Sequence, residues 1–317
     1  MSYDKAVKQI TVVGTGTIGA SWTTHYLSRG FDVTATDPGP DAEAKVRKYV
    51  DEAWGLLEAN GLVADGASRD RLSFTANQSD ALAKADFVQE NAPERPGTDF
   101  KPKLYVDLDD ATPEDTIIAS SSSGIPPSTI QSMCKHPERV LIGHPFNPPH
   151  IVPLVEVVGG TKTSPDAVKQ AMAFYAEVGK KPILLHKELR GHVANRLQAA
   201  LYREITYLIQ QGALSVEDAD NAVSFGPGLR WGVMGPSLQW HLGGGAGGIQ
   251  HYMDTLYDGL MHLASSQVMP DVNDELKKTI VDGVLAEAGD RTLDQLAQDE
   301  NEVMLAALKL REQHGFG

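Results

Sequence analysis

Two ionisable side chains, His144 and Glu156, stand in segments of the sequence where buried strands are expected. His144 comes at the end of the apolar run that starts at Arg139, and Glu156 interrupts the apolar run IVPLVEVV (residues 151–158). A carboxylate inside such a run is costly unless it is paired. The economical partner is His144, because Glu156 would orient the imidazole and stabilise its protonated form, which leaves the second ring nitrogen to accept a proton. The pair predicts general-base chemistry.

A glycine-rich turn gives the most specific local signal in the chain. The residues GTGTIG (14–19) follow an apolar run and precede a helix-compatible stretch. Gly14 permits a tight turn, Gly16 lets the backbone approach a pyrophosphate, and Gly19 lets the helix pack on the strand, with the helix N-terminus pointing at the anion. The turn therefore predicts a dinucleotide site formed by Gly14, Gly16, Thr17, Ile18 and Gly19.

Asp37 strengthens this assignment and selects the cofactor. It ends a second β-branched run, roughly the expected 20 residues past the glycines, where a carboxylate can bond both ribose hydroxyls. The carboxylate would repel a 2′-phosphate, and the following Pro-Gly-Pro offers no arginine to hold one. The expected cofactor is NAD rather than NADP. A plain tight turn, with Asp37 capping the next helix, is the competing interpretation, and it leaves the strand-turn-helix context unexplained.

A nicotinamide cofactor gives the His-Glu pair a specific task. Alone, His144 could be a hydrogen-bonded core residue and Glu156 the partner of a surface lysine. Together, at the ends of neighbouring strands in a nucleotide-binding domain, they favour catalysis. The base would remove the hydroxyl proton of a secondary alcohol while hydride leaves for the nicotinamide ring.

The elements that must position these residues divide the chain into two halves. Up to residue 188, β-branched runs alternate with helix-compatible stretches such as residues 41–58, which predicts βαβ units and a mostly parallel sheet. His144 would then lie on the same rim as the glycine loop, at the carboxyl ends of the strands. The strand-like runs are residues 10–14, 32–37, 87–91, 116–121, 139–146, 154–160 and 182–186.

After residue 188 the strand-like runs almost vanish. Apolar residues follow helical spacing over residues 195–211, 216–223, 274–287 and 292–313, and the glycine-rich segment 226–248 separates these stretches. We therefore predict an α/β fold with two domains. Residues 1–188 would form a Rossmann-type, doubly wound NAD-binding domain, and residues 189–317 an all-α domain for substrate binding and dimerisation.

Composition excludes several classes of partner. The 317 residues include 28 Lys and Arg against 42 Asp and Glu, a net charge of −14, which argues against nucleic acids and anionic membranes. The single cysteine, Cys134, can form neither an internal disulfide nor a structural zinc site, and no HExxH-like pair indicates a catalytic metal. Because no apolar run is long enough to span a bilayer and no signal-peptide pattern is present, we expect a cytoplasmic protein.

The motifs together resemble one family. Their order and spacing resemble those of the 3-hydroxyacyl-CoA dehydrogenase superfamily. The matching motifs are GTGTIG, Asp37, ASSSSG (119–124), GHPFNP (143–148), LVEVV (154–158) and GHVANRL (191–197). The resemblance covers essentially the whole chain. It implies that His144, in the H-x-F-N-P motif, is the general base and that Glu156 is its partner. It also implies that Ser123 contacts the substrate hydroxyl and the nicotinamide, that Asn195 of the G-F-x-x-N-R-L motif lies beside the substrate oxygen, and that the helical half forms a twofold dimer.

The serine-rich turn departs from the family pattern S-N-T-S-S. Ser121 and Ser122 replace asparagine and threonine, and Gly124 replaces a serine. A flexible polar loop is the simpler interpretation of four consecutive serines, and spacing favours a function for Ser123 alone. Asn147, which matches the asparagine of the H-x-F-N-P motif, is expected to hold its loop.

The charge of the segment after the second strand narrows the range of possible substrates. Family members that use CoA meet its phosphates with basic residues after the second strand, but residues 41–75 hold five basic against seven acidic side chains here. This disfavours CoA and favours a small 3-hydroxy acid. Three stretches resemble the family members that oxidise L-carnitine to 3-dehydrocarnitine: QENAPER (89–95), GLRWGVMG followed by GGGAGGIQHYM (228–253), and QHGF (313–316).

A carnitine site would need an aromatic surface. A trimethylammonium group donates no hydrogen bonds and is held by aromatic faces, at roughly 0.5 to 2 kcal/mol each. The segment from Phe225 to Tyr252 also contains Trp231 and Trp240, and Arg230 could clamp the carboxylate. Arg230, Trp231 and Tyr252 are the candidate substrate residues. Packing of the aromatic rings in a helical core is the competing interpretation.

Three functions stay open at this point. NAD-dependent oxidation of L-carnitine or a similar small 3-hydroxy acid is favoured. The same chemistry on a 3-hydroxyacyl-CoA or on L-gulonate comes second. A crystallin-like or redox-sensing protein that binds NAD without turnover is the third, and the presence of His144, Glu156, Ser123 and Asn195 argues against it, since a binding module needs no base and partner.

Overall fold

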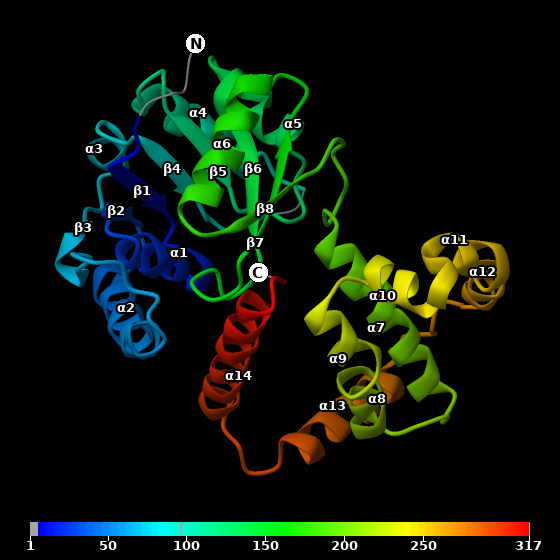
Figure 1. Cartoon of the computed structure of the whole chain (residues 1–317). Helices are drawn as coiled ribbons and strands as arrows, with labels where there is room; N and C mark the ends of the chain where they lie inside the picture. Colours follow the sequence, from blue (N-terminus) through cyan, green and yellow to red (C-terminus); the bar gives the residue numbers. More distant parts are fainter. Residues whose placement is uncertain (1–5, 96, 317) are drawn as a thin grey trace. The chain divides into compact units, whose positions relative to one another are not determined.

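The computed structural model describes residues 6–95 and 97–316, and the chain forms two compact units, Met1–Val193 and Ala194–Gly317. The first unit contains a mostly parallel sheet with helices, and the second is helical throughout (Figure 1). The predicted fold class is therefore confirmed. The first unit ends five residues after residue 188, the domain boundary that the sequence predicts.

One eight-stranded sheet organises the first unit, with the strand order β3-β2-β1-β4-β5-β6-β7-β8. Its strands are β1 (Gln9–Val13), β2 (Asp32–Thr36), β3 (Leu72–Phe74), β4 (Phe87–Glu90), β5 (Ile117–Ser120), β6 (Val140–Pro145), β7 (Leu154–Gly159) and β8 (Lys181–Leu184). All neighbouring strands are parallel except β6 and β7. The chain runs outward from β1 to β3 and then returns to β4 on the other side of β1. Ligands of doubly wound sheets bind at such a reversal, outside the carboxyl ends of the strands.

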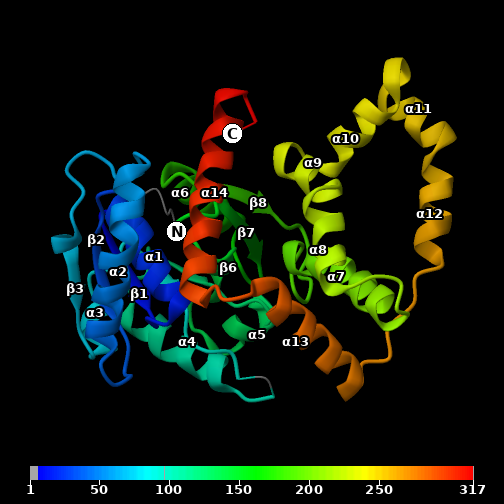
Figure 2. The ribbon, with the colours of Figure 1, turned by 90° about the horizontal axis from the view of Figure 1, so that it is seen from below.

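Helices cover both faces of this sheet. They are α1 (Thr17–Ser28), α2 (Ala42–Ala59), α3 (Gln78–Leu82), α4 (Phe100–Ala111), α5 (Pro127–Ile130) and α6 (Pro165–Glu177), with short 3₁₀ turns η1 (Arg69–Arg71), η2 (Gln131–Met133) and η3 (Pro137–Arg139). Figure 2 shows α6 on one side of the sheet and α4 and α5 on the other. The central strands of the sheet are therefore buried on both faces.

Alternation along the strands builds a separate core on each face. On β5, Ile117 and Ala119 pack in the cluster that holds the aromatic residues of α1 and α6, whereas Ile118 packs in the cluster that holds Tyr105 and Leu108 of α4. Successive side chains of a strand point to opposite faces, so strands buried on both sides appear in the sequence as continuous apolar runs. This is why most of the strands could be predicted.

One strand, β3, was not predicted. Its three residues, Leu72–Phe74, include a single buried side chain, that of Leu72, and it pairs with β2 at the edge of the sheet. A run this short has no alternation that distinguishes it from a loop.

The second unit consists of helices. They are α7 (Ala194–Gln210), α8 (Val216–Ser224), α9 (Pro227–Val233), α10 (Pro236–Gly243), α11 (Gly248–Thr255), α12 (Tyr257–Ser265), α13 (Asp274–Ala288) and α14 (Leu293–Gln313), with the 3₁₀ turn η4 (Gly245–Gly247). The four predicted helical stretches correspond to α7, α8, α13 and α14. The sequence did not predict the short helices α9 to α12, because the glycines and prolines between them hide the apolar spacing.

Across residues 6–95 and 97–316, no helix is both long and apolar enough to cross a membrane.

Candidate active site

The two candidate catalytic side chains are direct cross-strand neighbours. The antiparallel register of β6 and β7 places His144 opposite Glu156, and Nδ1 of His144 lies 2.8 Å from Oε2 of Glu156. Glu156 is fully buried and His144 is 7 % exposed. Because a carboxylate only accepts, Nδ1 carries the proton, which leaves the lone pair of the neutral ring on Nε2. The arrangement can accept a proton at Nε2 and stabilise the resulting charge.

The position of Glu156 differs from the expectation. The sequence predicts both residues at strand ends, but Glu156 is the third residue of the six-residue β7. The two residues still pair, because the antiparallel register of β6 and β7 places the middle of β7 opposite the end of β6. The second oxygen of Glu156, Oε1, accepts the backbone N–H of Val193 at 2.7 Å. Glu156 is therefore bonded through both of its oxygens.

Ser123 lies in a tight turn after β5 that one carboxylate organises. Oε1 of Glu94 accepts hydrogen bonds from Oγ of Ser122 at 2.6 Å, from the N–H of Ser123 at 2.5 Å and from the N–H of Gly124 at 2.9 Å. Burial favours a raised pKa for Glu94, but these hydrogen bonds outweigh it and lower the pKa below its ordinary value. Glu94 therefore holds the turn through both side-chain and backbone hydrogen bonds.

The sequence did not predict the contacts of Glu94 with the turn. Glu94 lies in the QENAPER stretch, but nothing in its spacing connects it with serines about 30 residues later. Ser122, expected to be an inert loop residue, is 3 % exposed and bonds Glu94. Such contacts between two loops depend on the tertiary fold and have no periodic signal.

The glycine loop has the features that a dinucleotide requires. Gly14 has a φ of +83°, which L side chains rarely adopt, and a Cβ at Gly19 would lie 1.8 Å from the carbonyl oxygen of Gly14. A Cβ at Gly16 would meet no atom within 4 Å. Helix α1 starts at Thr17 with neither an acidic residue in its first turn nor a side-chain cap, so the N–H groups of its N-terminus can bind an anion.

Asp37 follows β2 directly and contacts this loop. Its Oδ2 accepts the N–H of Thr15 at 2.7 Å and the hydroxyl of Thr15 at 3.1 Å, and its Oδ1 accepts the N–H of Gly39 at 2.7 Å. A carboxylate offers about four acceptor positions, so one remains on Oδ1 for a further donor such as a ribose hydroxyl. The residues present therefore fit NAD.

Two glycine substitutions separate loop packing from cofactor approach. Gly16→Ala should leave the thermal unfolding midpoint of the free protein unchanged, because its methyl group meets open space. It should still weaken NAD binding about tenfold, or 1.4 kcal/mol, because the backbone at this position must approach the pyrophosphate. Gly19→Ala should lower both the unfolding midpoint and the affinity for NAD, since its methyl group collides with the carbonyl oxygen of Gly14. Calorimetric titration and thermal unfolding measure the two effects, and wild-type affinity in Gly16→Ala would contradict the assignment.

The candidate residues of the second unit are distributed over three helices. Asn195 is the second residue of α7, Arg230 and Trp231 belong to α9, and Tyr252 belongs to α11. Tyr252 is 9 % exposed and stacks on Trp240, with ring centroids 5.6 Å apart. Packing thus describes Tyr252 better than an open aromatic face does. Trp231 keeps 40 % of its surface exposed.

Within the described part of the chain, the guanidinium group of Arg230 has one hydrogen-bond partner, Gln239. Nε of Arg230 donates to Oε1 of Gln239 at 2.9 Å, and the backbone carbonyl of Arg230 accepts from Nε2 of Gln239 at 3.2 Å. Gln239 therefore holds Nε, the guanidinium nitrogen nearest the aliphatic part of the side chain. The terminal nitrogens keep donors that a carboxylate could use.

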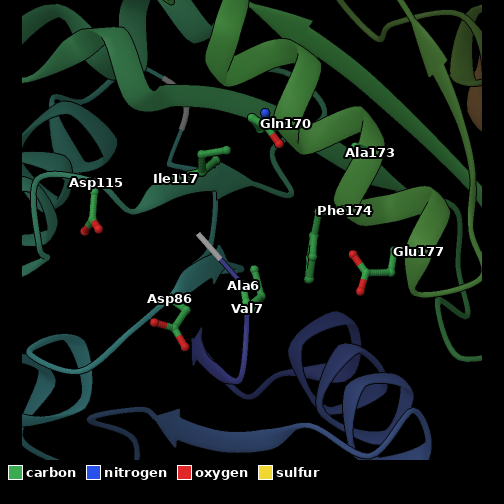
Figure 3. A pocket seen from close by; sticks show the side chains of 9 residues that line it. All are labelled: Ala6, Val7, Asp86, Asp115, Ile117, Gln170, Ala173, Phe174 and Glu177. Carbon is green, nitrogen blue, oxygen red and sulfur yellow. The ribbon is translucent and has the colours of Figure 1, made fainter. Parts of the chain in front are cut away.

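A cavity in the first unit lies beside the amino-terminal ends of β4 and β5, away from the strand ends that carry the candidate site. It has a volume of about 130 Å³ and is lined by Ala6, Val7, Asp86, Asp115, Ile117, Gln170, Ala173, Phe174 and Glu177 (Figure 3). The strands β4 and β5 begin beside it, whereas the dinucleotide loop and Ser123 follow strand ends. Among the described residues, no three His, Cys, Asp or Glu side chains are grouped so that they could hold a metal ion.

Comparison with known proteins shows the family to which the chain belongs. Residues 9–189 match the NAD-binding domain of 3-hydroxyacyl-CoA dehydrogenase, and residues 191–281 match its C-terminal domain. L-carnitine dehydrogenase from Streptomyces griseus subsp. griseus is 44 % identical over 303 residues, which cover 96 % of this chain and 90 % of the relative. The enzyme of the same name from Bacillus cereus is 40 % identical over 312 residues, covering 98 % and 95 %.

A solved structure has the same architecture. The NAD⁺-dependent 5-formyl-3-hydroxy-2-methylpyridine 4-carboxylic acid 5-dehydrogenase superposes with a TM-score of 0.84 at 30 % identity, covering 97 % of this chain and 99 % of the other. The similarity therefore extends over both units of the chain.

Proposed function

The chain belongs to the 3-hydroxyacyl-CoA dehydrogenase family and is an NAD-dependent dehydrogenase that acts on CH–OH groups; from this premise we propose that it oxidises the 3-hydroxyl of L-carnitine, with His144 as the general base. The observation that carries the mechanism is the 2.8 Å contact between His144 and Glu156. The substrate rests on relatives of 40 to 44 % identity that are named for L-carnitine.

The proposed reaction uses this chain's residues for binding and proton transfer. The first turn of α1, with Gly14, Gly16 and Asp37, would hold NAD, which when bound supplies the acceptor for the hydride from the carbinol carbon. Nε2 of His144 takes the hydroxyl proton as the C–O bond becomes a carbonyl. Glu156 stabilises the imidazolium that forms and keeps the ring in the productive tautomer. Ser123 and Asn195 would donate hydrogen bonds to the substrate oxygen.

Recognition of carnitine is assigned to α9. Trp231 would face the trimethylammonium group, and the free end of the Arg230 guanidinium would bind the carboxylate. Tyr252 remains the third proposed contact, although its ring is stacked on Trp240. The acidic excess over residues 41–75 favours a small substrate over CoA.

Trp231→Ala tests this recognition. It should raise the KM for L-carnitine up to about tenfold, because a cation–π contact is worth roughly 0.5 to 2 kcal/mol. The Kd for NAD should stay within twofold of the wild-type value. Steady-state kinetics and NAD titration measure the two effects, with Trp240→Phe as the aromatic control. Equal losses in carnitine and NAD binding would contradict the proposed contact of Trp231 with the trimethylammonium group.

A substrate panel tests the function itself. NADH formation should be measured with L-carnitine, L-gulonate, 3-hydroxybutyrate and 3-hydroxybutyryl-CoA. The proposal predicts the highest kcat/KM for L-carnitine. A higher value for the CoA thioester or for gulonate would assign the chain to another substrate, and NAD binding without NADH formation on any of them would favour a crystallin-like or redox-sensing role.

We also propose a cytoplasmic homodimer that assembles through the second unit. Leu197 and Leu201, one turn apart on α7, are 66 % and 36 % exposed, and Tyr202 beside them is 52 % exposed. An apolar surface of this kind usually faces a partner. Light scattering of the purified protein should give twice the mass of the chain, and Leu197→Glu should shift it to the monomer.

A further inference from the structure

The three consecutive residues 191–193 connect the turn that contains Ser123 to Glu156, the partner of His144. The N–H of Gly191 donates to the carbonyl of Ser123 at 3.2 Å, and the N–H of Val193 donates to Oε1 of Glu156 at 2.7 Å. Between them, Nε2 of His192 lies 3.0 Å from the carbonyl oxygen of Ser122. We call residues 191–193 the 191–193 clamp.

The backbone of the clamp is shaped for these bonds. Gly191 has a φ of +76° and His192 a φ of +49°, so two consecutive residues adopt left-handed conformations. A non-glycine residue with positive φ costs energy and persists only where its surroundings hold it. Here the surroundings are the bond of the His192 ring to Ser122, the bond of its N–H to the carbonyl of Leu189, and the bond of the Val193 N–H to Glu156. The strained residue is therefore part of the same bonding pattern.

His192 is a second buried imidazole beside the base. It is 2 % exposed, and its ring centroid lies 4.8 Å from that of His144. A carbonyl oxygen only accepts, so Nε2 of His192 carries the proton and donates it to Ser122. Within the described residues, Nδ1 has no hydrogen-bond partner.

The protonation state of His192 follows from its surroundings. Burial chiefly, and then the charge that His144 can carry, lower its pKa, against the opposing effects of the Ser122 carbonyl and of the carboxylates Glu156 and Glu94. His192 is thus a neutral donor and does not compete with His144 for the substrate proton.

We propose that His192 is a positioning residue, which through its bond to the Ser122 carbonyl holds Ser123 in register with His144 and Glu156. Ser123 is then held from both sides, by Glu94 on its N–H and by the clamp on the carbonyls of residues 122 and 123. This proposal rests on the proposed function, because positioning has a consequence only if His144 and Ser123 act on the substrate.

Two substitutions separate the hydrogen bond from the ring. His192→Phe keeps an aromatic ring but loses the donor, and kcat should fall about thirtyfold, since small misplacements in an active site cost up to a hundredfold. The Kd for NAD should not change. His192→Gln carries an amide N–H at a position equivalent to Nε2 and should restore kcat to within threefold of the wild type.

His25→Phe is the matched control. His25 is also buried, at 3 % exposure, and its Nε2 also bonds a backbone carbonyl, that of Val178, at 2.9 Å. His25 lies near the end of α1, whereas His144 and Glu156 lie on β6 and β7. The control should lower the unfolding midpoint about as much as His192→Phe does, with kcat unchanged.

A double-mutant cycle tests the route through the serine. If His192 acts by placing Ser123, the variant His192→Phe/Ser123→Ala should lose no more activity than the more damaging single variant. Additive losses, or an unchanged kcat in His192→Phe, would overturn the proposal while the function stands. Failure of His192→Gln to recover activity would also overturn it. A wild-type protein that forms no NADH from any hydroxy acid would overturn both proposals.

Discussion

Replacing His144 with alanine should lower kcat for alcohol oxidation by about 10³-fold, within the range expected for loss of a general base. The substituted residue is the one whose Nε2 accepts the hydroxyl proton in the proposed reaction. NAD binding should stay within twofold of the wild-type value, because the residues assigned to NAD follow β1 and β2 and His144 lies on β6. Single-turnover kinetics and calorimetric titration measure these quantities.

Added imidazole is the control for this variant. A small exogenous base can enter the space left by the side chain and should restore part of the turnover of His144→Ala, whereas it should not accelerate the wild-type protein. Wild-type turnover in His144→Ala would show that another group accepts the proton.

Glu156→Gln should lower kcat by about 10²- to 10³-fold with little change in the size of the side chain. The carboxylate of Glu156 accepts from Nδ1 of His144 and from the N–H of Val193. An amide has one oxygen, so its NH₂ group must face one of these two donors. If it faces His144, the ring must carry its proton on Nε2, which is the wrong tautomer to accept a proton. If it faces Val193, two buried donors meet.

Measurements of folding and of NAD binding separate the role of Glu156 in catalysis from its role in folding. Lost activity with a native far-UV spectrum and normal NAD binding would assign the effect to the imidazole. Glu156→Asp, which keeps the charge, should be less damaging than Glu156→Gln. A Glu156→Gln variant with the kcat of the wild type would contradict the role of the pair.

The sequence predicted the elements that carry those candidate residues whose placement depends on local pattern. The glycine turn, Asp37 and the two strands that carry His144 and Glu156 combine residue type with apolar periodicity, and the structure places them at strand ends or opposite one another. Family resemblance then related these motifs to one reaction.

The contacts that the sequence did not predict join distant loops. Glu94 bonds residues about 30 positions away, and His192 bonds Ser122 across 70 positions. Neither lies in a periodic segment. Most of their partners are backbone groups, which every residue has, so the residue types at the other end give little signal. The aromatic residues of α9 to α11 are a related case, because only the structure shows that Tyr252 packs on Trp240 while Trp231 stays exposed.

Hydride transfer from L-carnitine deuterated at the carbinol carbon is the most direct test of the central claim. The wild-type protein should produce NADH that carries one deuterium, detected by mass spectrometry, together with 3-dehydrocarnitine, and His144→Ala should produce almost none. NADH without deuterium, or no NADH from L-carnitine while another hydroxy acid is oxidised, would contradict the proposal.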